Sequence, residues 1–401
     1  MTNTRILVIG DAVAPTGYAR VIRSIFERLC NRFDIFQLAT RFNGESHDWP
    51  WKLIPAGTES DPYGWAILPS VIDELRPDII FLLYDLKFQP IFIERINLAG
   101  SKARIVIYSP IESGPIEPEI LMPLGSVARY VVFTQRAAEI VEQSAFLPGW
   151  GKKDPKIPKL AVIPHGVDCK VFRPLAETRN ASRRAARECL GLEQDHDAFF
   201  VFNGNRNIAK KRLDLTIAGF AGFALGKPEN VKLIMHCDIK GSGWNLPMLA
   251  RRHGVLGRLV FTFDSDKFLP VDNTKLNIFY NAADVGINTS NSEGWGLVSL
   301  EHGATGHPQI VPDTPCLRSI WGDAAIYLDS AAEMTYRHDL TTGTVVSHQS
   351  ISAELERLYV DIPWRESMGD MAYARANDLQ LNWNSIAESW ADLFTEVVSE
   401  G

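Results

Sequence analysis

Two glutamates, Glu293 and Glu301, stand with seven residues between them in the glycine-rich stretch NSEGWGLVSLEHGATGHP. The residues before Glu293 predict a strand that ends in a polar loop, and residues 295–305 predict a helix with Gly306 at its C-cap. Glu293 then lies in the loop and Glu301 about two turns inside the helix, which separates them by roughly 10 Å. This spacing does not suit the close carboxylate pair of a retaining glycosidase.

Each carboxylate is better suited to accept hydrogen bonds from hydroxyls on different parts of one extended ligand. Gly294 and Gly296 carry no side chain, so backbone amides near them can approach the same ligand. The alternative is structural: Glu293 caps the helix and Glu301 lies on a solvated face.

A second stretch, VFNGNRNIAKKRLDL, places four cations where a strand passes into a helix. They are Arg206, Lys210, Lys211 and Arg212. Positive charge at a helix N-terminus is unfavourable unless an anion joins it, and a diphosphate would satisfy both the cations and the free amides. The alternative is a solvated basic helix start.

A third stretch, GDAVAPTGYARV, predicts a strand that ends at Gly10 and a helix that opens after Gly17. Amides at such a helix start suit a phosphate. The stretch lacks the G-x-G-x-x-G pattern of dinucleotide sites, and a plain turn between strand and helix remains the alternative.

The strands and helices that must position these stretches fall into two groups along the chain. Short apolar runs predict strands at residues 5–10, 77–85, 103–110, 128–135 and 159–168, and again at 198–205, 231–238, 258–263, 283–290 and 308–313. Helical segments separate them, which is typical of parallel α/β units. The sequence therefore predicts two Rossmann-like, doubly wound domains whose facing strand ends form a cleft. The expected divisions are 1–175, 176–377 and an amphipathic C-terminal helix at 378–401.

Composition excludes several classes of protein. The chain has 401 residues, of which 46% are hydrophobic and 22% charged, and its net charge is −7. That balance is typical of a globular protein with a full core and argues against a dominant nucleic-acid footprint. Five scattered cysteines predict neither a disulfide framework nor a zinc site. A reducing, cytoplasmic location is expected, without a signal peptide or a membrane-spanning segment.

With these stretches in view, the chain resembles a retaining glycosyltransferase of the GT-B fold, of the glycosyltransferase family 4 type. The family's glutamate, glycine, aromatic, glycine and second glutamate fall on Glu293, Gly294, Trp295, Gly296 and Glu301. The family's arginine, lysine and aspartate fall on Arg206, Lys211 and Asp214, and VIPHGVDCKVFRP resembles its domain junction.

The resemblance implies a role for each matched residue. Arg206 and Lys211 would hold the donor diphosphate and stabilise charge on the leaving phosphate. Glu301 would bind the ribose, and Gly17 would lie under the phosphates. Glu293 would hold the donor sugar's hydroxyls. The full implied set is catalytic Arg206, Lys211 and Glu293, and donor-binding Gly17, Glu293, Gly294, Trp295, Gly296, Leu297 and Glu301.

The implied activity is transfer of a hexose from a nucleoside-diphosphate sugar to a hydroxyl acceptor with retention, assisted by the leaving phosphate and independent of metal. No cofactor beyond the donor substrate is expected. Two alternatives are a nucleotide-sugar-binding regulatory module without turnover and a GT-B-like sugar-nucleotide epimerase. The sugar, the base, the oligomeric state and the acceptor, which could be a saccharide, lipid, protein or nucleic acid, are left open.

Acceptor residues are assigned from weaker signals in the N-terminal half. Many family members have a histidine after the strand that here reads RIVIYSP, where this chain offers Ser109, Pro110 and Glu112, and Glu112 is assigned to the acceptor. Trp49 and Trp51 belong to an aromatic-rich stretch, SHDWPWKLIPAGTESDPYGW, whose rings could stack on a sugar or a base, with packing under a long loop as the alternative. The segment FDSDK at 263–267 imitates the D-x-D metal motif of a different glycosyltransferase fold, and no metal is assigned to it.

Overall fold

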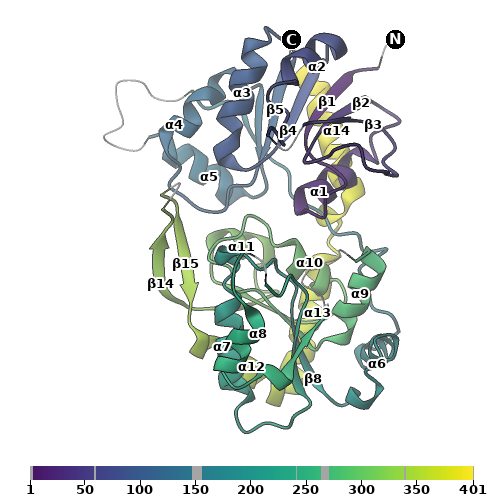
Figure 1. Cartoon of the computed structure of the whole chain (residues 1–401), viewed down its shortest axis with the longest axis vertical. Coiled ribbons are helices and arrows are strands. Elements are labelled where there is room, and N and C mark those ends of the chain that lie inside the picture. Colours follow the sequence, from purple (N-terminus) through teal and green to yellow (C-terminus); the bar gives the residue numbers. More distant parts are fainter. Residues whose placement is uncertain are drawn as a thin grey trace. The chain divides into compact units, whose positions relative to one another are not determined.

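The computed structural model describes residues 3–57, 60–146, 156–240, 242–262, 271–337 and 340–400. They form two compact α/β units, which are drawn in Figure 1. The N-terminal unit comprises Met1–Gly166, Tyr336–Thr341 and Gln380–Gly401. The C-terminal unit comprises Val167–Thr335 and Thr342–Leu379.

The N-terminal unit is built on a seven-stranded parallel sheet with the order β3-β2-β1-β4-β5-β6-β7. Its strands are β1 (Arg5–Asp11), β2 (Asp34–Thr40), β3 (Lys52–Pro55), β4 (Ile79–Leu83), β5 (Arg104–Ser109), β6 (Arg129–Val132) and β7 (Leu160–Val162). The helices are α1 (Gly17–Phe26), α2 (Leu68–Leu75), α3 (Gln89–Leu98), α4 (Pro118–Leu121), α5 (Gln135–Ser144) and α14 (Trp383–Ser399), with 3-10 turns η1 (Leu86–Phe88), η2 (Met122–Ser126) and η6 (Leu379–Leu381) at or near this unit.

The central strands explain why this sheet is parallel and covered on both faces. All five residues of β4, the sequence IIFLL, are buried, and six of the seven residues of β1 are buried. A strand that is apolar on both faces needs helices on both sides. The strand order reverses between β1 and β4, and in doubly wound sheets ligands bind at the carboxyl ends of the strands at this switch point.

The C-terminal unit repeats the plan with a six-stranded parallel sheet in the order β10-β9-β8-β11-β12-β13. Its strands are β8 (Phe199–Asn203), β9 (Val231–Met235), β10 (Leu259–Phe261), β11 (Val285–Ile287), β12 (Gln309–Pro312) and β13 (Ile326–Leu328), and an antiparallel hairpin adds β14 (Ser330–Thr335) and β15 (Thr342–Val346). Here the order reverses between β8 and β11, so the switch point lies where these two neighbours end.

Helices cover this second sheet and complete its core. They are α6 (Arg179–Cys189), α7 (Leu213–Ala224), α8 (Leu246–Arg252), α9 (Asn273–Ala282), α10 (Leu297–Gly303), α11 (Pro315–Trp321), α12 (His348–Val360) and α13 (Ile362–Ala376), with 3-10 turns η3 (Glu193–Asp195), η4 (Ala209–Lys211) and η5 (Leu256–Arg258). The α7–α12 contact is close enough that a side chain on Gly219 would collide with Ile351.

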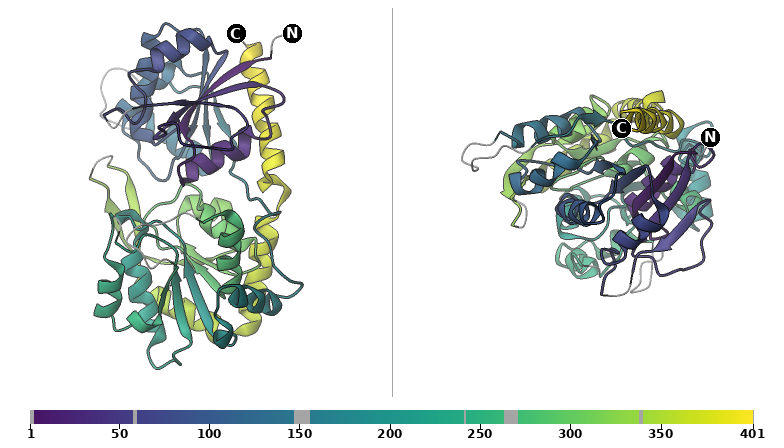
Figure 2. Two further views of the ribbon diagram at one scale, coloured as in Figure 1. Left: turned by 45° about the vertical axis from the view of Figure 1, so that its right-hand side comes forward. Right: turned by 90° about the horizontal axis from the view of Figure 1, so that it is seen from above.

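The final helix, α14, belongs to the N-terminal unit and packs beside α1, as the yellow helix in Figure 2 shows. Phe394 of α14 stacks on Phe26 of α1 with ring centroids 6.0 Å apart. Arg32 and Glu388 form an ion pair at 2.7 Å. The expectation that the last helix returns to the N-terminal domain is therefore confirmed.

The α/β fold with two doubly wound sheets is confirmed, and each of the ten predicted strands corresponds to an observed strand. Strands β2, β3 and β13 and the β14–β15 hairpin were not predicted. The division between the units falls at Gly166/Val167, ahead of residue 175. The intervening segment bonds to α9, because Asn277 Oδ1 accepts from Arg173 N at 3.1 Å and Asn281 Oδ1 accepts from Leu175 N at 3.3 Å.

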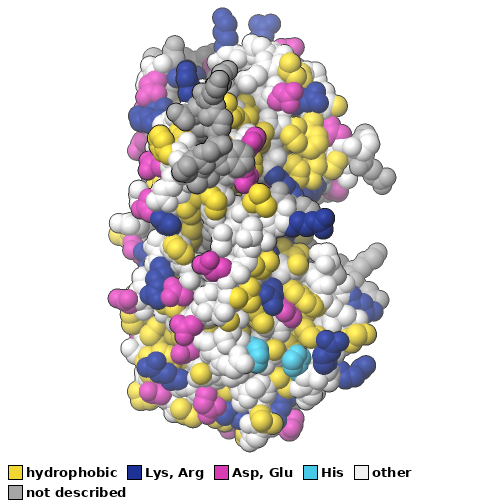
Figure 3. Space-filling model, turned by 90° about the vertical axis from the view of Figure 1, so that its left-hand side faces the viewer, with side chains coloured by type: hydrophobic (Ala, Val, Ile, Leu, Met, Phe, Trp, Pro, Cys, Tyr) yellow, Lys and Arg dark blue, Asp and Glu magenta, His cyan; other side chains and the backbone are white. Residues whose placement is uncertain are grey.

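Among the described residues, none of the helices combines the length and the apolar character that a membrane crossing requires. On the face drawn in Figure 3, Lys and Arg side chains are interspersed with Asp and Glu side chains over both units. Cys30, Cys169, Cys189, Cys237 and Cys316 are all free thiols.

Candidate functional site

Two loops of the C-terminal unit carry the predicted chemistry, and both start at the switch point of its sheet. The first loop follows β8 and contains η4, which ends at Lys211. The second follows β11 and runs from Asn288 to Gly296, where α10 begins. Since β8 and β11 are neighbours, the two loops emerge side by side from the carboxyl edge of the sheet.

Lys211 and Glu293 are in direct contact. The Lys211 Nζ lies 2.7 Å from both Oε1 and Oε2 of Glu293. The side chains are only 10% and 9% exposed, so this is a buried ion pair. Asn288 adds a hydrogen bond from its Nδ2 to Glu293 Oε1 at 3.2 Å. Burial by itself would raise the pKa of Glu293, but the charge and hydrogen bond of Lys211, with smaller contributions from Lys210 and Asn288, outweigh it and lower the pKa.

A network of small polar residues fixes the two loops to each other. Thr289 donates from Oγ1 to the carbonyl oxygens of Lys211 at 3.1 Å and Arg212 at 2.9 Å, and it contacts Thr216 Oγ1 at 2.8 Å. Asn291 N donates to the carbonyl oxygen of Lys210 at 2.8 Å. These bonds hold the backbone that carries Lys211 against the backbone that carries Glu293.

Glu301 is positioned from a third element, α9. Tyr280 donates from its hydroxyl to Glu301 Oε2 at 3.0 Å, and both residues are buried. The Tyr280 ring is stacked on His302, with centroids 5.1 Å apart and planes at 12°. Burial lowers the pKa of His302 to about 3, so this imidazole is neutral at physiological pH.

The helix that carries Glu301 is shorter than predicted. It spans Leu297–Gly303 instead of 295–305, because Gly296 adopts the left-handed conformation at φ 83° and ends the preceding loop. Glu301 therefore stands a little more than one turn inside the helix, not two. Gly306 does have positive φ, at 89°, but it closes a turn beyond the last helical residue.

The glycine-rich start of α10 differs in exposure from one residue to the next. Gly294, Trp295 and Gly296 are buried, and Leu297 is half-buried. A Cβ placed on Gly296 would lie 3.5 Å from Glu293 Cγ, so this glycine packs directly against the carboxylate side chain.

Arg206 does not share the burial of Lys211. It lies in the loop after β8 with an exposed side chain. The next residue anchors this loop: Asn207 donates from Nδ2 to the carbonyl oxygens of Asp238 at 2.9 Å and Trp244 at 2.7 Å. Arg206 is thus a solvated cation on a fixed backbone, beside the buried cation at Lys211.

Gly17 belongs to the other unit, at the first position of α1. Thr16 is the N-cap of this helix, and its side chain accepts from Ala19 N at 3.1 Å and donates to Asp11 Oδ2 at 2.9 Å. Gly17 is exposed, and its loop follows β1 at the switch point of the N-terminal sheet.

The three residues assigned to the acceptor lie in different surroundings. Trp49 and Trp51 are buried, pack edge to face with centroids 5.0 Å apart, and Trp51 Nε1 donates to Gln37 Oε1 at 3.0 Å. This geometry supports the alternative of internal packing for both indoles. Glu112 is half-buried in the loop that follows β5.

The segment 263–270, with its D-x-D imitation, lies outside the described residues. Across the ranges that are described, no group of three or more His, Cys, Asp or Glu side chains is arranged to hold a metal ion.

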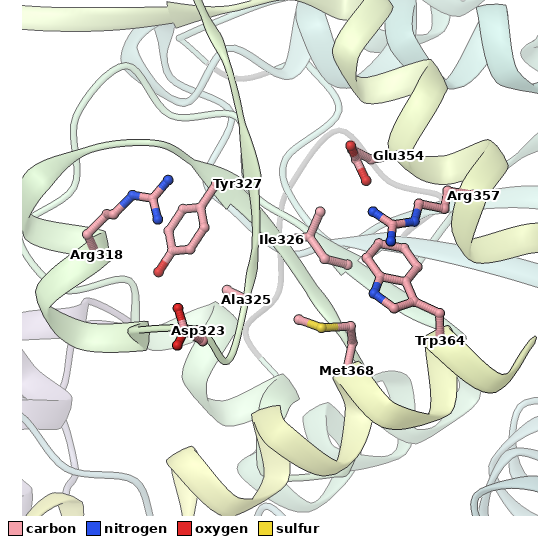
Figure 4. A pocket seen from close by; sticks show the side chains of 9 residues that line it. All are labelled: Arg318, Asp323, Ala325, Ile326, Tyr327, Glu354, Arg357, Trp364 and Met368. Carbon is pink, nitrogen blue, oxygen red and sulfur yellow. The ribbon is translucent and has the colours of Figure 1, made fainter. Parts of the chain in front are cut away.

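Two of the surface cavities formed by the described residues lie away from these loops. One of about 280 Å³ borders the edge strand β13, where Arg318 lies against Tyr327 and Arg357 against Trp364 (Figure 4). The other, of about 530 Å³, is lined by α3 and Pro123. Neither contains a predicted site residue, so the candidate site is defined by the two loops and not by cavity size.

Three residues that position the predicted site residues were not themselves predicted from the sequence. Tyr280 orients Glu301, Asn288 bonds to Glu293, and Thr289 ties the loops together. The run NTSNS was a usable signal, because five consecutive small polar residues after a buried strand are all buried here. Buried polar groups are normally hydrogen-bonded, so such a run indicates a network.

Comparison with solved structures identifies the fold. Sucrose-phosphate synthase from Thermosynechococcus elongatus superimposes with a TM-score of 0.75 over 100% of both chains, at 15% identity. Anabaena HepE in complex with UDP-glucose gives 0.71 at 15% identity over 98% of this chain and 100% of that one. Trehalose 6-phosphate synthase from Burkholderia multivorans gives 0.70 at 14% identity, with complete coverage of both. These are GT-B structures, and the chain has the GT-B fold.

Sequence comparison finds curated relatives over part of the chain. D-inositol 3-phosphate glycosyltransferase 2 of Catenulispora acidiphila is 32% identical over 178 residues, 44% of this chain and 38% of that protein. The enzyme of that name from Kineococcus radiotolerans is 28% identical over 252 residues, 60% of this chain and 53% of its own. The chain thus spans about half or less of these relatives. No family model matches the chain. The resemblance to GT-B glycosyltransferases of the family 4 type is confirmed.

Proposed function

We propose that this chain, with its GT-B fold and family 4 relatives, is a retaining glycosyltransferase that moves a hexose from a nucleoside-diphosphate sugar to a hydroxyl acceptor. The observation that carries the proposal is the Lys211–Glu293 contact, at 2.7 Å, between two loops at one switch point. Such a pair places a cation for a diphosphate beside a carboxylate for sugar hydroxyls.

Lys211 contributes positive charge where the leaving diphosphate gains negative charge. An ammonium group has three N–H donors, so contact with a phosphate oxygen is compatible with a bond to Glu293. Arg206 is exposed in the same loop after β8, where its guanidinium can bind phosphate in a bidentate manner. A cation that is fixed before the reaction needs little reorganisation in the transition state.

Glu293 and Glu301 hold the two ends of the donor. Glu293 has a lowered pKa and is therefore ionised at neutral pH, which leaves it able only to accept hydrogen bonds, as sugar hydroxyls require. Glu301, which Tyr280 orients, accepts from the ribose hydroxyls.

The reaction exchanges one bond at the anomeric carbon for another on the same face. The bond from C1 to the β-phosphate oxygen breaks, the acceptor oxygen bonds to C1, and the acceptor's proton passes to a leaving-phosphate oxygen. Lys211 and Arg206 compensate the charge on that phosphate, so the proposed transfer requires neither a metal ion nor a protein nucleophile.

The donor can be identified before the acceptor. Thermal-shift screening against a panel of nucleotide sugars tests binding, because a ligand raises the apparent stability by an amount that grows with the logarithm of its concentration over Kd. UDP-hexoses come first, since the structural neighbour HepE from Anabaena was solved in complex with UDP-glucose.

Turnover then separates the candidate functions. Incubation with radiolabelled donor should give a glycosylated product that retains the donor's anomeric configuration by NMR. An inverted product would contradict the retaining mechanism. Donor binding without hydrolysis or transfer would instead show a regulatory module, and an isomerised donor without acceptor would show an epimerase. Glu301→Ala and Lys211→Ala should abolish transfer, with circular dichroism confirming that each variant is folded.

A further inference from the structure

Three aromatic rings of the N-terminal unit form a continuous, half-buried surface that the proposed reaction does not yet use. We call Tyr63, Trp65 and Phe88 the aromatic platform. Tyr63 stacks on Trp65 with centroids 4.7 Å apart and planes at 26°, and it contacts Phe88 at 4.9 Å and 36°. All three side chains retain partial exposure, in contrast to the buried Trp49 and Trp51.

The platform lies at the carboxyl edge of its sheet. Its support is Tyr84, a buried residue that directly follows β4 and contacts Tyr63 at 5.7 Å and Phe88 at 5.5 Å. Tyr18, in the first turn of the helix after β1, contacts Tyr84 at 6.2 Å. Since β1 and β4 are the neighbours at the switch point, the rings stand where doubly wound sheets bind ligands.

Polar groups border the rings. The Arg41 guanidinium lies 6.0 Å from the Tyr63 ring centroid, and the Lys87 ammonium lies 5.0 Å from that of Phe88. Tyr18 donates from its hydroxyl to the exposed Asp85. Two cations therefore lie against the rings, and the carboxylate of Asp85 lies beside Tyr18.

Backbone strain gathers at the same edge. Val13, two residues after β1, has φ 59°, and Arg41, directly after β2, has φ 56°. Positive φ is unfavourable for any side chain other than glycine and most of all for a β-branched one such as Val13. Residues held in this way cluster at ligand sites, where the surrounding structure maintains them.

We propose that the aromatic platform binds the acceptor, and that the acceptor presents a saccharide ring. This rests on the proposed glycosyltransferase function. The C–H face of a sugar stacks on aromatic rings, while its hydroxyls reach the guanidinium of Arg41 and the carboxylate of Asp85. Because the border offers both hydrogen-bond donors and an acceptor, a ring that carries hydroxyls fits this surface.

The experiment measures transfer from the identified donor to methyl hexosides, to nucleosides and to a single-stranded oligonucleotide. We expect transfer to methyl hexosides. Trp65→Ala and Tyr63→Ala should raise the KM for the hexoside by about tenfold, the size expected when one stacking ring is lost, with the KM for the donor unchanged. Trp65→Phe and Tyr63→Phe keep a ring and should restore a nearly normal KM.

The control is Phe146→Ala, which removes a ring that is 77% exposed and lies outside the platform. It should leave both KM values unchanged. Transfer to a nucleoside or oligonucleotide but to no hexoside would overturn the acceptor class, and an unchanged hexoside KM in both alanine variants would overturn the platform. If the wild-type protein neither binds nor turns over any nucleotide sugar, the proposed function fails instead. Calorimetric titration of the wild type and Trp65→Ala with methyl hexosides then tests the platform separately, since equal heats in the two proteins would overturn it.

Discussion

Lys211 Nζ lies 2.7 Å from each carboxylate oxygen of Glu293, in a pair that is almost fully buried. The family resemblance gives these residues different partners, a phosphate for the lysine and sugar hydroxyls for the glutamate. In this chain the two side chains also neutralise each other's charge and form hydrogen bonds with each other. Substitution of one therefore changes the environment of the other, and effects on stability and on activity have to be measured separately.

Removing one member of the pair should be costly to stability. Lys211→Met leaves a buried carboxylate without its counter-ion, which typically costs about 3–5 kcal/mol. The double variant Lys211→Met/Glu293→Gln leaves no unpaired charge and should recover most of that loss, while transfer stays abolished. Urea denaturation and a donor-transfer assay on both variants check this. With Glu293→Gln measured as well, a double variant whose loss of stability equals the sum of the two single losses would show that the pair is not energetically coupled.

The ion pair also predicts a dependence of stability on pH. The folded-state pKa of Glu293 is lower than the unfolded value of about 4.3, so the pair stabilises the fold above that pH and the contribution is lost as pH falls through the folded pKa. The difference in Tm between wild type and Glu293→Gln should therefore be greatest near pH 7 and shrink below about pH 4. A difference that grows on acidification would contradict the lowered pKa.

Tyr280→Phe tests the role of the hydroxyl that reaches Glu301. The change removes the hydrogen bond that holds the Glu301 carboxyl group but keeps the ring stacked on His302, so we expect donor Kd to rise by about tenfold. Calorimetric titration with the donor measures it. Tyr359→Phe is the matched control in the same unit, where the ring packs edge to face on Phe199. An equal loss in both variants would mean that the Tyr280 hydroxyl has no specific role.

Gly296→Ala separates backbone strain from site geometry. Gly296 has φ 83°, and left-handed backbone costs a residue with a Cβ about 1–2 kcal/mol. Gly100 has φ 62° and open space around its Cβ position, so Gly100→Ala should lose a similar amount of stability. Only Gly296→Ala should also weaken donor binding, because the strained turn carries Glu293. Donor titrations and Tm values of the two variants give the comparison, and normal binding by Gly296→Ala would argue against this turn as part of the site.

Chelation tests the proposed independence of metal. If Lys211 and Arg206 supply the positive charge at the leaving phosphate, transfer rates should be the same with and without EDTA. A loss of activity that Mg²⁺ or Mn²⁺ restores would contradict this part of the proposal. Arg206→Lys keeps the charge but removes the planar fork, so it should lower kcat by less than Arg206→Ala does.

The fold was largely readable from the sequence because buried parallel strands are short continuous apolar runs. The sequence RILVIG at β1 and IIFLL at β4 give that signal plainly. By contrast, β2 reads DIFQLAT, where the buried Gln37 and Thr40 interrupt the apolar pattern. These polar residues bond to the end of β1, so tertiary contacts stabilise what local pattern does not show.

The sequence singled out Lys211 and Glu293 as candidate site residues, but it did not predict that their side chains contact each other. The pattern of strands predicted that the loops carrying Lys211 and Glu293 share one space, but the direct pairing of β8 with β11 and the contact of the two side chains depend on tertiary packing. Tyr280 was missed for the same reason, since it reaches Glu301 from a helix 21 residues earlier. Trp49 and Trp51, which were assigned to the acceptor, are buried, so aromatic rings in a loop-like stretch can be core residues.

The bonds from Thr289 and Asn291 to the backbone of Lys210, Lys211 and Arg212 have a consequence for protein engineering. A designer who wishes to change the donor preference of this scaffold would gain little by grafting one loop from a relative. The loop after β8, the loop after β11 and Thr216 are joined by hydrogen bonds, so they should be exchanged together as one unit. Chimeras that exchange both segments at once should retain a working geometry more often than chimeras that exchange either alone.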